Sequence, residues 1–507
     1  MSPMEYSGKK AARVLAAFLL GIGGPLEAQA VDRFATVRGF IQRQIVEGGL
    51  PSVTVAVAKD GKILWEEGFG WADRERRVRA GPDTPYSLAS ISKPITATAV
   101  MRLAEQATIN LDRPANDYLG GAQITGTAGN PGDATVRRLL SHTAGLPLHY
   151  EFFYAGAPFR ERSNDEAIVR YGVLAVAPGR AFHYSNLGYG VLDEIITRVA
   201  GVSYPDYMRA QVFVPLGMTR SSVHLAPELA QYAATRYDAR QRPIPYYDFD
   251  HDGGSAIYAS AHDLVRFGMF HLKNRLADQR AILTDSTIDA MQRVQTPENS
   301  ETPYGLGWFL QPDDHGFRRV SHGGGMPGVS TMLALFPSEN LAVAVLLNAA
   351  NPTANGLIVE QVVAAVLPRY REALANRRPA NSVVSEATPF QPPAELVGEW
   401  TGELRTYQGA TPVRLAVHRD GDIHVRVGSQ PEAVLDGPSF RSGVLTGRLA
   451  ATIPTEDAAR YPHYVTLNLW LRDGILSGSA SALTPREPVW YFALSSFVEL
   501  RRTGSSR

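Results

Sequence analysis

The strand-like segments in the first 375 residues of this chain lie at the two ends, with a helical pattern between them. Residues 53–70, VTVAVAKDGKILWEEGFG, form two β-rich runs around an Asp-Gly turn, which is a strong hairpin signal. Further strand-like runs occupy 318–336 and 341–350, whereas about 90–300 is mostly helical pattern broken by Gly- and Pro-rich loops. Strands from both ends are expected to share one sheet. We therefore predict an α+β fold, in which an antiparallel sheet is flanked by helices and accompanied by an all-helical lobe.

The C-terminal part of the chain has a different pattern. After a polar, proline-bearing segment at 376–393, only strand-like runs follow, with Asp-Gly turns at 420–421 and 473–474. Roughly eight short strands favour a small antiparallel barrel or sandwich, because closure removes exposed edges. The sequence therefore predicts a first domain over 31–375, a linker at 376–393 and a C-terminal β-barrel at 394–507.

The first thirty residues have the pattern of an export signal. Three basic residues precede an apolar stretch at 14–26, and the small residues AQA end at Ala30. The apolar stretch is shorter than the ~20 residues that a spanning helix needs. We expect a signal peptide over 1–30, a mature chain in the periplasm or outside the cell, and no stable membrane insertion. An uncleaved N-terminal anchor is the alternative.

The composition excludes several classes of function. Fifty basic and fifty acidic residues cancel in charge, which gives no sign of a nucleic-acid partner. The absence of cysteine excludes disulfides, thiol nucleophiles and Cys-based zinc sites. The twelve histidines include no close H-x-x-x-H pair, so that neither zinc nor another cofactor is expected.

The segment DFDHDGG resembles the start of a calcium loop. Asp248, Asp250 and Asp252 precede Gly253 in the D-x-D-x-D-G spacing of such loops. The closing glutamate is missing, because position 259 is alanine. We expect a polar loop near the functional site, and no metal there.

The segment YSLASISKPITA places Ser90 three residues before Lys93, with Pro94 directly after. Proline is tolerated only in the first turn of a helix, so a helix is expected to begin at about Ser90. Side chains at i and i+3 share a helix face, and a helix N-terminus stabilises developing negative charge. Burial can lower the pKa of a lysine enough for it to take a serine proton. Taken alone, the spacing also fits a capping serine and a solvated lysine.

Two further motifs follow this pair along the chain. Tyr184 and Asn186 form a Y-x-N arrangement in FHYSNLGYG, and His322 precedes a glycine-rich turn in SHGGGMPG. In this order, the three elements resemble the signatures of the serine β-lactamase and penicillin-binding-protein superfamily. The resemblance covers about 50–350 and is closest to the class C β-lactamase-related branch, which includes esterases, D-aminopeptidases and DD-carboxypeptidases. The C-terminal barrel resembles the lipocalin-like domains of some members.

The resemblance implies a role for each matched side chain. Ser90 would attack a carbonyl and form an acyl-enzyme. Lys93 and Tyr184 would share the proton transfers, and the resemblance leaves open which of the two is the base. Asn186 would hydrogen-bond Lys93 and a substrate amide. His322 would orient the substrate or aid proton transfer.

The resemblance also implies that the glycine-rich segment contributes to the oxyanion hole and influences which substrates are preferred. The resemblance implies that the backbone N–H groups of Ser90 and Gly325 hold the oxyanion, with Gly323 and Gly324 beside the substrate. β-Lactamases and DD-peptidases typically carry a hydroxyl residue, which binds the substrate carboxylate, where this chain has Gly323. Its loss weakens carboxylate binding by a few kcal/mol at most, and favours less polar substrates.

These observations predict an exported serine hydrolase that cleaves small ester or amide bonds. A D-amino-acid peptidase or DD-carboxypeptidase of cell-wall peptides is the first alternative, and a β-lactamase is the next. A non-catalytic binding protein is disfavoured, because such proteins usually lose the lysine or the tyrosine. The expected partners are a small molecule or short peptide and, as a homo-oligomer, further copies of the chain.

Two sets of ring-bearing residues are interpreted as structural. His142 lies in LLSHTAGLP, which resembles a structural segment of the family, and we interpret it as a packing and turn residue. Tyr407, Trp470, Trp490 and Tyr491 are expected in the core and rim of the barrel, and not in a ligand cage.

Overall fold

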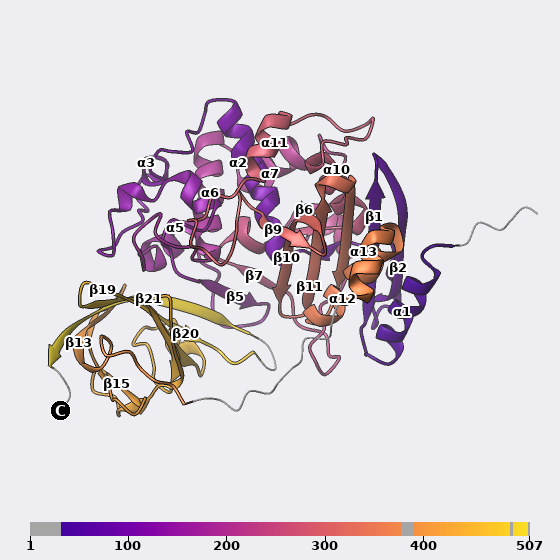
Figure 1. Cartoon of the computed structure of the whole chain (residues 1–507). Helices are drawn as coiled ribbons and strands as arrows, with labels where there is room; N and C mark the ends of the chain where they lie inside the picture. Colours follow the sequence, from indigo (N-terminus) through magenta and orange to yellow (C-terminus); the bar gives the residue numbers. More distant parts are fainter. Residues whose placement is uncertain (1–31, 377–388, 487–489, 505–507) are drawn as a thin grey trace, which may run out of the picture.

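The computed structural model describes residues 32–376, 389–486 and 490–504. The expected signal peptide and residues 377–388 of the expected linker lie outside these described residues. The described chain forms a larger domain of helices and a sheet, and a C-terminal antiparallel barrel (Figure 1). The predicted α+β fold class with an added barrel is confirmed.

The main sheet of the larger domain joins strands from its two ends, as predicted. The strand order is β3-β2-β1-β12-β11-β10-β9. At its centre β1 and β12 pair antiparallel, from Val53 opposite Leu347 to Lys59 opposite Leu341. The strands are β1 (Ser52–Lys59), β2 (Lys62–Asp73), β3 (Val78–Arg79), β9 (Phe309–Asp314), β10 (Phe317–Met326), β11 (Val329–Phe336) and β12 (Leu341–Leu347).

Helices cover both faces of this sheet, which explains why its central strands are apolar along their whole length. Side chains alternate between the faces of a strand. Val55 and Val57 of β1 therefore pack in one cluster with α1 (Ala35–Val46) and α12 (Pro352–Val366). Ala56 belongs to the opposite cluster, which includes α10 (Ala261–His271). A last helix of this domain, α13 (Pro368–Ala375), follows α12.

The middle of the chain forms the helical lobe beside the sheet (Figure 1). Its longest helices are α2 (Ser92–Glu105) and α6 (Asn186–Ala200), which pack on each other. The shorter helices are α3 (Asn116–Leu119), α4 (Val136–Leu140), α5 (Asn164–Tyr171), α7 (Tyr204–Met208), α8 (Pro227–Ala230), α9 (Asp252–Ser255) and α11 (Asp285–Met291). A small sheet of order β4-β8-β6 consists of β4 (Tyr86–Ser87), β8 (Ile257–Ala259) and β6 (Ser222–Val223). Among the described helices, none is both long and apolar enough to cross a bilayer.

The barrel is built by hairpins, two of which turn at the predicted Asp-Gly pairs. Its strands are β13 (Gly398–Thr406), β14 (Gly409–Val417), β15 (Ile423–Val427), β16 (Ala433–Val434), β17 (Asp436–Arg441), β18 (Val444–Leu449), β19 (Tyr464–Arg472), β20 (Ile475–Leu483) and β21 (Phe492–Gly504). Leucine and valine side chains such as Leu415, Val425 and Leu469 fill its interior. The cavity that remains among them measures about 10 Å³, which is room for about one water molecule.

The barrel continues into the larger domain through strand pairing. Its last strand, β21, pairs with β5 (Tyr150–Tyr154), which in turn pairs with β7 (Tyr247–Phe249). Phe492 of β21 lies opposite Glu151 of β5, and Ala493 lies opposite Tyr150. The start of β21, which extends beyond its pairing with β13, is therefore paired with a strand from the other domain.

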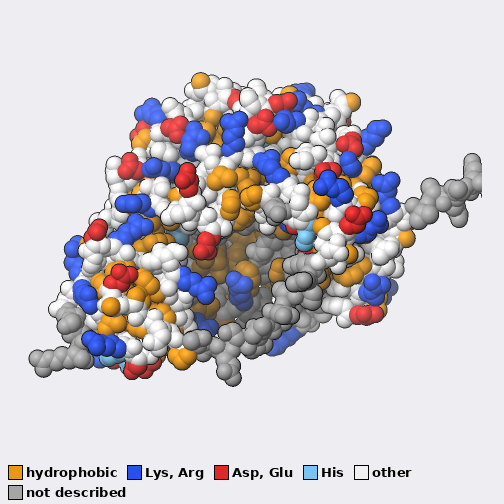
Figure 2. Space-filling view, in the orientation of Figure 1, with side chains coloured by type: hydrophobic (Ala, Val, Ile, Leu, Met, Phe, Trp, Pro, Cys, Tyr) orange, Lys and Arg blue, Asp and Glu red, His pale blue; other side chains and the backbone are white. Residues whose placement is uncertain are grey.

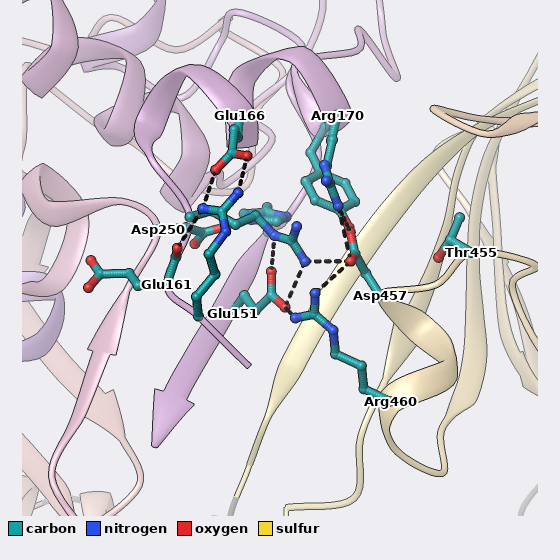
Figure 3. A network of polar contacts seen from close by, with 12 residues as sticks. Glu151, Glu161, Glu166, Arg170, Asp250, Thr455, Asp457 and Arg460 are labelled. Atoms are coloured by element: carbon teal, nitrogen blue, oxygen red, sulfur yellow. Dashed lines mark hydrogen bonds and ion pairs between the residues drawn. The ribbon is translucent and has the colours of Figure 1, made fainter. Parts of the chain in front are cut away.

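A cluster of buried ion pairs, which we call the interface cluster, joins the domains beside β5 (Figure 3). Arg162 Nε lies 2.9 Å from Glu151 Oε2, and Arg162 Nη2 lies 2.5 Å from Asp457 Oδ1 of the barrel. Arg460 of the barrel contacts both carboxylates, at 2.5 Å from Glu151 and 2.8 Å from Asp457. Arg170 adds a contact of 2.8 Å to Asp457. Each buried carboxylate thus has cations from both domains.

Candidate active site

Ser90 lies in a short 3₁₀ turn, Ala89–Ile91, directly before α2. Ala89 has a φ of 50°, a left-handed conformation that costs a non-glycine residue about 1 kcal/mol. Pro94 is the third residue of α2 and leaves no intrahelical donor missing, because the first-turn N–H groups lack partners in any helix. The helix begins two residues later than predicted, and Ser90 lies at its N-terminal end.

Lys93 is fully buried and points at Ser90. Its Nζ lies 3.2 Å from Ser90 Oγ, 2.8 Å from Asn186 Oδ1 and 2.9 Å from the Gly254 carbonyl oxygen. Burial lowers the pKa of the Lys93 amine well below its usual value. All three contacts are uncharged, so no carboxylate offsets the cost of burying an ammonium.

Burial favours the neutral form of the Lys93 amine, and its three partners can accommodate that form. An uncharged amine has two N–H groups and one lone pair. Asn186 Oδ1 and the Gly254 carbonyl oxygen can only accept, so they take the two N–H groups. The lone pair then faces Ser90 Oγ. The arrangement can remove the Ser90 proton.

Tyr184 reaches the same serine from the segment before α6. Its side chain interacts with that of Ser90, and the Lys93 Nζ atom lies 4.9 Å from its ring centroid. Burial raises the pKa of Tyr184 above its usual value, and the interaction with Ser90 offsets only part of this rise. Tyr184 is therefore a neutral phenol in the free site, able to give a proton and to accept a hydrogen bond.

His142 lies directly against Tyr184, with ring centroids 4.2 Å apart. It has the turn conformation expected of it, with a φ of 57°. Its Nδ1 accepts a hydrogen bond from the Ser185 N–H at 3.2 Å. Burial lowers the pKa of His142 well below its usual value. The residue therefore supports the phenol as an uncharged ring, a position that the sequence did not indicate.

Asn186 is the first residue of α6 and links Lys93 to β5. Its Oδ1 accepts from Lys93, while its Nδ2 donates to the His149 carbonyl oxygen at 2.8 Å. Ser185 caps the helix by accepting the Gly188 N–H at 3.1 Å. Because both ends of its amide are engaged, Asn186 has one orientation.

His322 lies in β10 and is buried and neutral. Its Nδ1 lies 2.8 Å from the Gly323 carbonyl oxygen and donates to it, so that Nε2 accepts from the Tyr304 hydroxyl at 3.1 Å. Burial, with the nearby Lys93, lowers the pKa of His322 to about 3. Its ring also packs on Phe309, at 5.0 Å between centroids. His322 thus forms part of an aromatic wall near the site.

The glycines after His322 differ in what surrounds them. A Cβ on Gly324 would lie 2.0 Å from the Leu88 carbonyl oxygen, so close packing of β10 against the Ser90 turn requires glycine there. A Cβ on Gly323 would meet the Met332 side chain at 3.1 Å. A Cβ on Gly325 would meet nothing within 4 Å, so this residue borders open space.

Sequence reasoning missed a buried histidine–aspartate–histidine arrangement beside Lys93. Asp250 Oδ2 lies 2.6 Å from His149 Nε2, and Asp250 Oδ1 lies 2.7 Å from His251 Nδ1. Burial alone would raise the pKa of Asp250, but its contacts with His149 and His251 hold the pKa well below its usual value. The three residues precede Gly254, whose carbonyl holds Lys93. His251 could have been noticed inside DFDHDGG, whereas no local signal marks His149.

The other two aspartates of DFDHDGG also pair with histidine. Asp248 lies 3.2 Å from His224 Nδ1, and Asp252 lies 2.8 Å from His224 Nε2. Within the described residues, no group of histidine and acidic side chains has an arrangement that could hold a metal ion. The expected polar loop is wrong, because the segment runs from the end of β7 into α9 and is largely buried. It contacts the site through Gly254.

Comparison with known proteins adds sequence relatives over the larger domain. A family model described as Beta-lactamase matches residues 33–367. The chain is 26% identical over 313 residues to Protein flp of Staphylococcus aureus (strain N315), which is 61% of this chain and 61% of that protein. It is 29% identical over 296 residues to Penicillin-binding protein 4* of Bacillus subtilis (strain 168), which is 55% of this chain and 64% of that protein. The match therefore spans about three-fifths of the length of these relatives.

Solved structures with the same fold include some that match both domains. SurE aligns with a TM-score of 0.60 at 22% identity, covering 93% of this chain and 99% of SurE. The octameric penicillin-binding protein homologue from Pyrococcus abyssi aligns at 0.56 and 21%, covering 90% and 99%. A class C β-lactamase from Rhodobacter sphaeroides aligns at 0.55 and 21%, but covers only 65% of this chain. The first two alignments therefore extend into the barrel.

Proposed function

Because the chain belongs to the β-lactamase family, we propose that it is a serine hydrolase that cleaves small ester or amide bonds through an acyl-enzyme on Ser90. The observation that carries this proposal is the buried Lys93 amine. Its Nζ lies 3.2 Å from Ser90 Oγ, and two fixed acceptors engage its N–H groups. A neutral amine held in this way is a general base for a serine hydroxyl.

The first half of the reaction follows from the contacts around Ser90. Lys93 takes the Ser90 proton while Oγ forms a bond to the substrate carbonyl carbon. The N–H groups of Ser90 and Gly325 hold the oxyanion, aided by the N-terminal end of α2. Tyr184 donates its proton to the leaving oxygen or nitrogen as that bond breaks, and the Lys93 ammonium returns a proton to Tyr184.

The second half returns the enzyme to its starting state. A water molecule loses a proton to the neutral Lys93 and adds to the acyl carbon. The bond to Ser90 Oγ breaks, and the oxygen recovers its proton from Lys93. The net reaction consumes one water and gives one acid and one alcohol or amine. Lys93 is the favoured base, because burial lowers its pKa and raises that of Tyr184.

The test is a hydrolysis panel on the purified chain with p-nitrophenyl esters, D-alanyl peptides and nitrocefin. We expect ester cleavage that Ser90→Ala abolishes, and labelling by a fluorescent phosphonate that the same substitution removes. Ser286→Ala, at an exposed serine of α11, is the matched control and should change neither. Stronger turnover of D-alanyl peptides or nitrocefin would move the substrate class to cell-wall peptides or β-lactams. Activity that survives Ser90→Ala would contradict the proposal.

Two properties of the whole protein belong to the same proposal. We propose that it acts outside the cytoplasm, on the basis of the N-terminal sequence pattern, which fractionation of expressing cells would test. We also propose that copies of the chain associate, which the octameric assembly named for the Pyrococcus abyssi homologue supports. Light scattering on the purified protein would measure the mass, and a monomer at all concentrations would contradict association.

A further inference from the structure

A cavity of about 360 Å³ lies between the barrel and the end of β10. The larger domain contributes Gly325, Met326 and Val329, and the barrel contributes Arg486 and Trp490 from the loop before β21. Its volume is within the range of small-molecule sites. On the face shown in Figure 2, the surface is hollowed between the barrel and the larger domain. Trp490 packs against the hydrophobic core, as expected of a core or rim residue, and it also lines this cavity.

The barrel residues are held in place by the larger domain and by their own loop. The Thr484 hydroxyl accepts the N–H of Tyr491 at 2.9 Å, which closes the base of the loop. The Trp490 carbonyl accepts the Tyr154 hydroxyl of β5 at 2.6 Å. The Arg486 guanidinium lies 4.6 Å from the Trp490 ring centroid, a stacking that orients its planar group.

Among the described residues that line the cavity, one cation is available. Asp238 also lines it, but Asp238 pairs with Arg242 at 2.8 Å and accepts the Arg240 and Arg242 N–H groups at 2.9 Å. Its charge is therefore compensated. Among the described residues, Arg486 forms no ion pair. The described lining therefore favours an anion, which the guanidinium can bind through two N–H groups.

The position of the cavity assigns it to one part of a substrate. Gly325, whose N–H is placed in the oxyanion hole, borders both the reaction centre and the cavity. The leaving group must lie near Tyr184, which supplies its proton. Tyr184, Phe309 and His322 are not among the described lining residues of the cavity. The cavity therefore extends from the carbonyl on the side away from the leaving group, where the acyl part lies.

We propose that this cavity binds the acyl part of the substrate and that Arg486 binds a carboxylate carried on it. The proposal rests on the serine-hydrolase function and specifies its substrate as an acid-bearing acyl group with an apolar body. It also revises the preference for less polar substrates drawn from Gly323. The glycine-rich strand lacks the hydroxyl that binds a carboxylate, and the other domain supplies a cation instead.

The test compares two esters that differ only in one charge. Mono-p-nitrophenyl glutarate carries a free carboxylate on its acyl chain, and its methyl ester is neutral. We expect Arg486→Gln to lower kcat/KM for the charged ester about tenfold, with the neutral ester unchanged. Arg486→Lys should retain part of the preference, because it keeps the charge and loses the planar fork. Arg441→Gln, at an exposed arginine of β17, is the matched control.

The outcomes separate this proposal from the function on which it rests. An unchanged ratio of the two esters in Arg486→Gln, with Ser90-dependent cleavage intact, overturns the role of Arg486 alone. If neither ester is cleaved, calorimetric binding of the monoamide N-propylglutaramate to Ser90→Ala still decides the matter. Binding that the added Arg486→Gln substitution weakens about tenfold supports the cavity, and no binding, or equal binding by both proteins, contradicts it.

Discussion

Two buried basic side chains in this molecule are held in opposite ways. Lys93 contacts only uncharged groups, of which Asn186 and Gly254 are fixed acceptors. Arg162, in the interface cluster, has a side chain only 4% exposed and pairs with Glu151 and Asp457. Both side chains are almost completely shielded from water, but only Arg162 has carboxylates beside it.

The comparison shows that burial has different consequences according to the partner. Where carboxylates accompany the cation, their attraction offsets the lost hydration, and the charge stays. Where the partners are neutral, lost hydration dominates and the pKa of the amine falls. Burial of a basic side chain thus favours a neutral amine at Lys93 and a charged contact between the domains at Arg162.

The largest expected effect comes from replacing Lys93 with a side chain that stays positively charged. Lys93→Arg introduces a group that cannot lose its proton, so it should lower the rate of Ser90 acylation by about 10³-fold. Single-turnover release of p-nitrophenol measures this rate. Lys273→Arg, at an exposed site that pairs with Asp289, should leave it unchanged. An acylation rate within tenfold of the unmodified protein would move the base elsewhere.

Removing a charge from the interface cluster is the reverse experiment. Asp457→Asn leaves three arginines with one carboxylate fewer and should lower the free energy of unfolding by about 3 kcal/mol. Urea unfolding followed by tryptophan fluorescence measures it. Asp436→Asn breaks the exposed pair of Asp436 with Arg448 and should cost under about 1 kcal/mol. Equal losses in the two variants would show that the cluster adds nothing beyond a surface pair.

The same aspartate gives a pH dependence of stability. Burial alone would raise the pKa of Asp457, but hydrogen bonds from Tyr171 and Arg170 lower it to about 2, from 3.8. A carboxyl with a lowered folded-state pKa stabilises the protein above its unfolded value and loses this contribution as the pH falls through the folded one. We therefore expect the stability difference between the protein and Asp457→Asn to shrink from about pH 4 to pH 2. A constant difference over that range would contradict it.

A carboxylate placed beside Lys93 would make its surroundings resemble those of Arg162. Asn186→Asp places a negative charge at the atom that lies 2.8 Å from Lys93 Nζ, which raises the lysine pKa. Catalysis requires the neutral amine, so the acidic limb of the pH–rate profile should move to higher pH. Activity at neutral pH should fall about 30-fold and recover partly in alkali. An unchanged limb, with activity lost equally at every pH, would indicate misfolding of the site instead.

The smallest expected effect is at His322, which is buried without any charged partner in the described residues. Because its pKa is lowered to about 3, it stays neutral and should contribute no limb to the pH–rate profile above about pH 4. His322→Asn should lower kcat/KM about fivefold through the lost contact with Tyr304, and leave the profile's shape unchanged. A limb near neutral pH that disappears with His322 would overturn this.

Local features of the molecule could be read from neighbouring residues. Ser90 and Lys93 contact each other because they are spaced within one helical turn, and Pro94 indicates where that turn begins. The Asp-Gly hairpins depend only on residues in and beside the turn. The shared sheet could be predicted because its apolar strands had no other partner. For the serine–lysine pair and the hairpins, the physical cause lies within a few residues of its effect.

The features that sequence reasoning missed bring together distant segments. His149 meets Asp250 across about a hundred residues, and nothing around either one indicates the other. Arg486 enters the lining of a cavity beside Gly325 only because β21 pairs with β5. His142 was assigned to a turn, but its contact with Tyr184 depends on how two loops fold together.

By itself, the sequence determined which groups can do chemistry here: a serine, an amine one turn away, a phenol and a glycine-rich strand. Only the tertiary structure decided the ionisation state of these groups and which of them lie in contact. The pKa of Lys93 depends on how completely the packed lobe excludes water and on the lack of a carboxylate among its contacts. These are properties of the assembled surroundings, because hydration is lost only when separate segments close around a group.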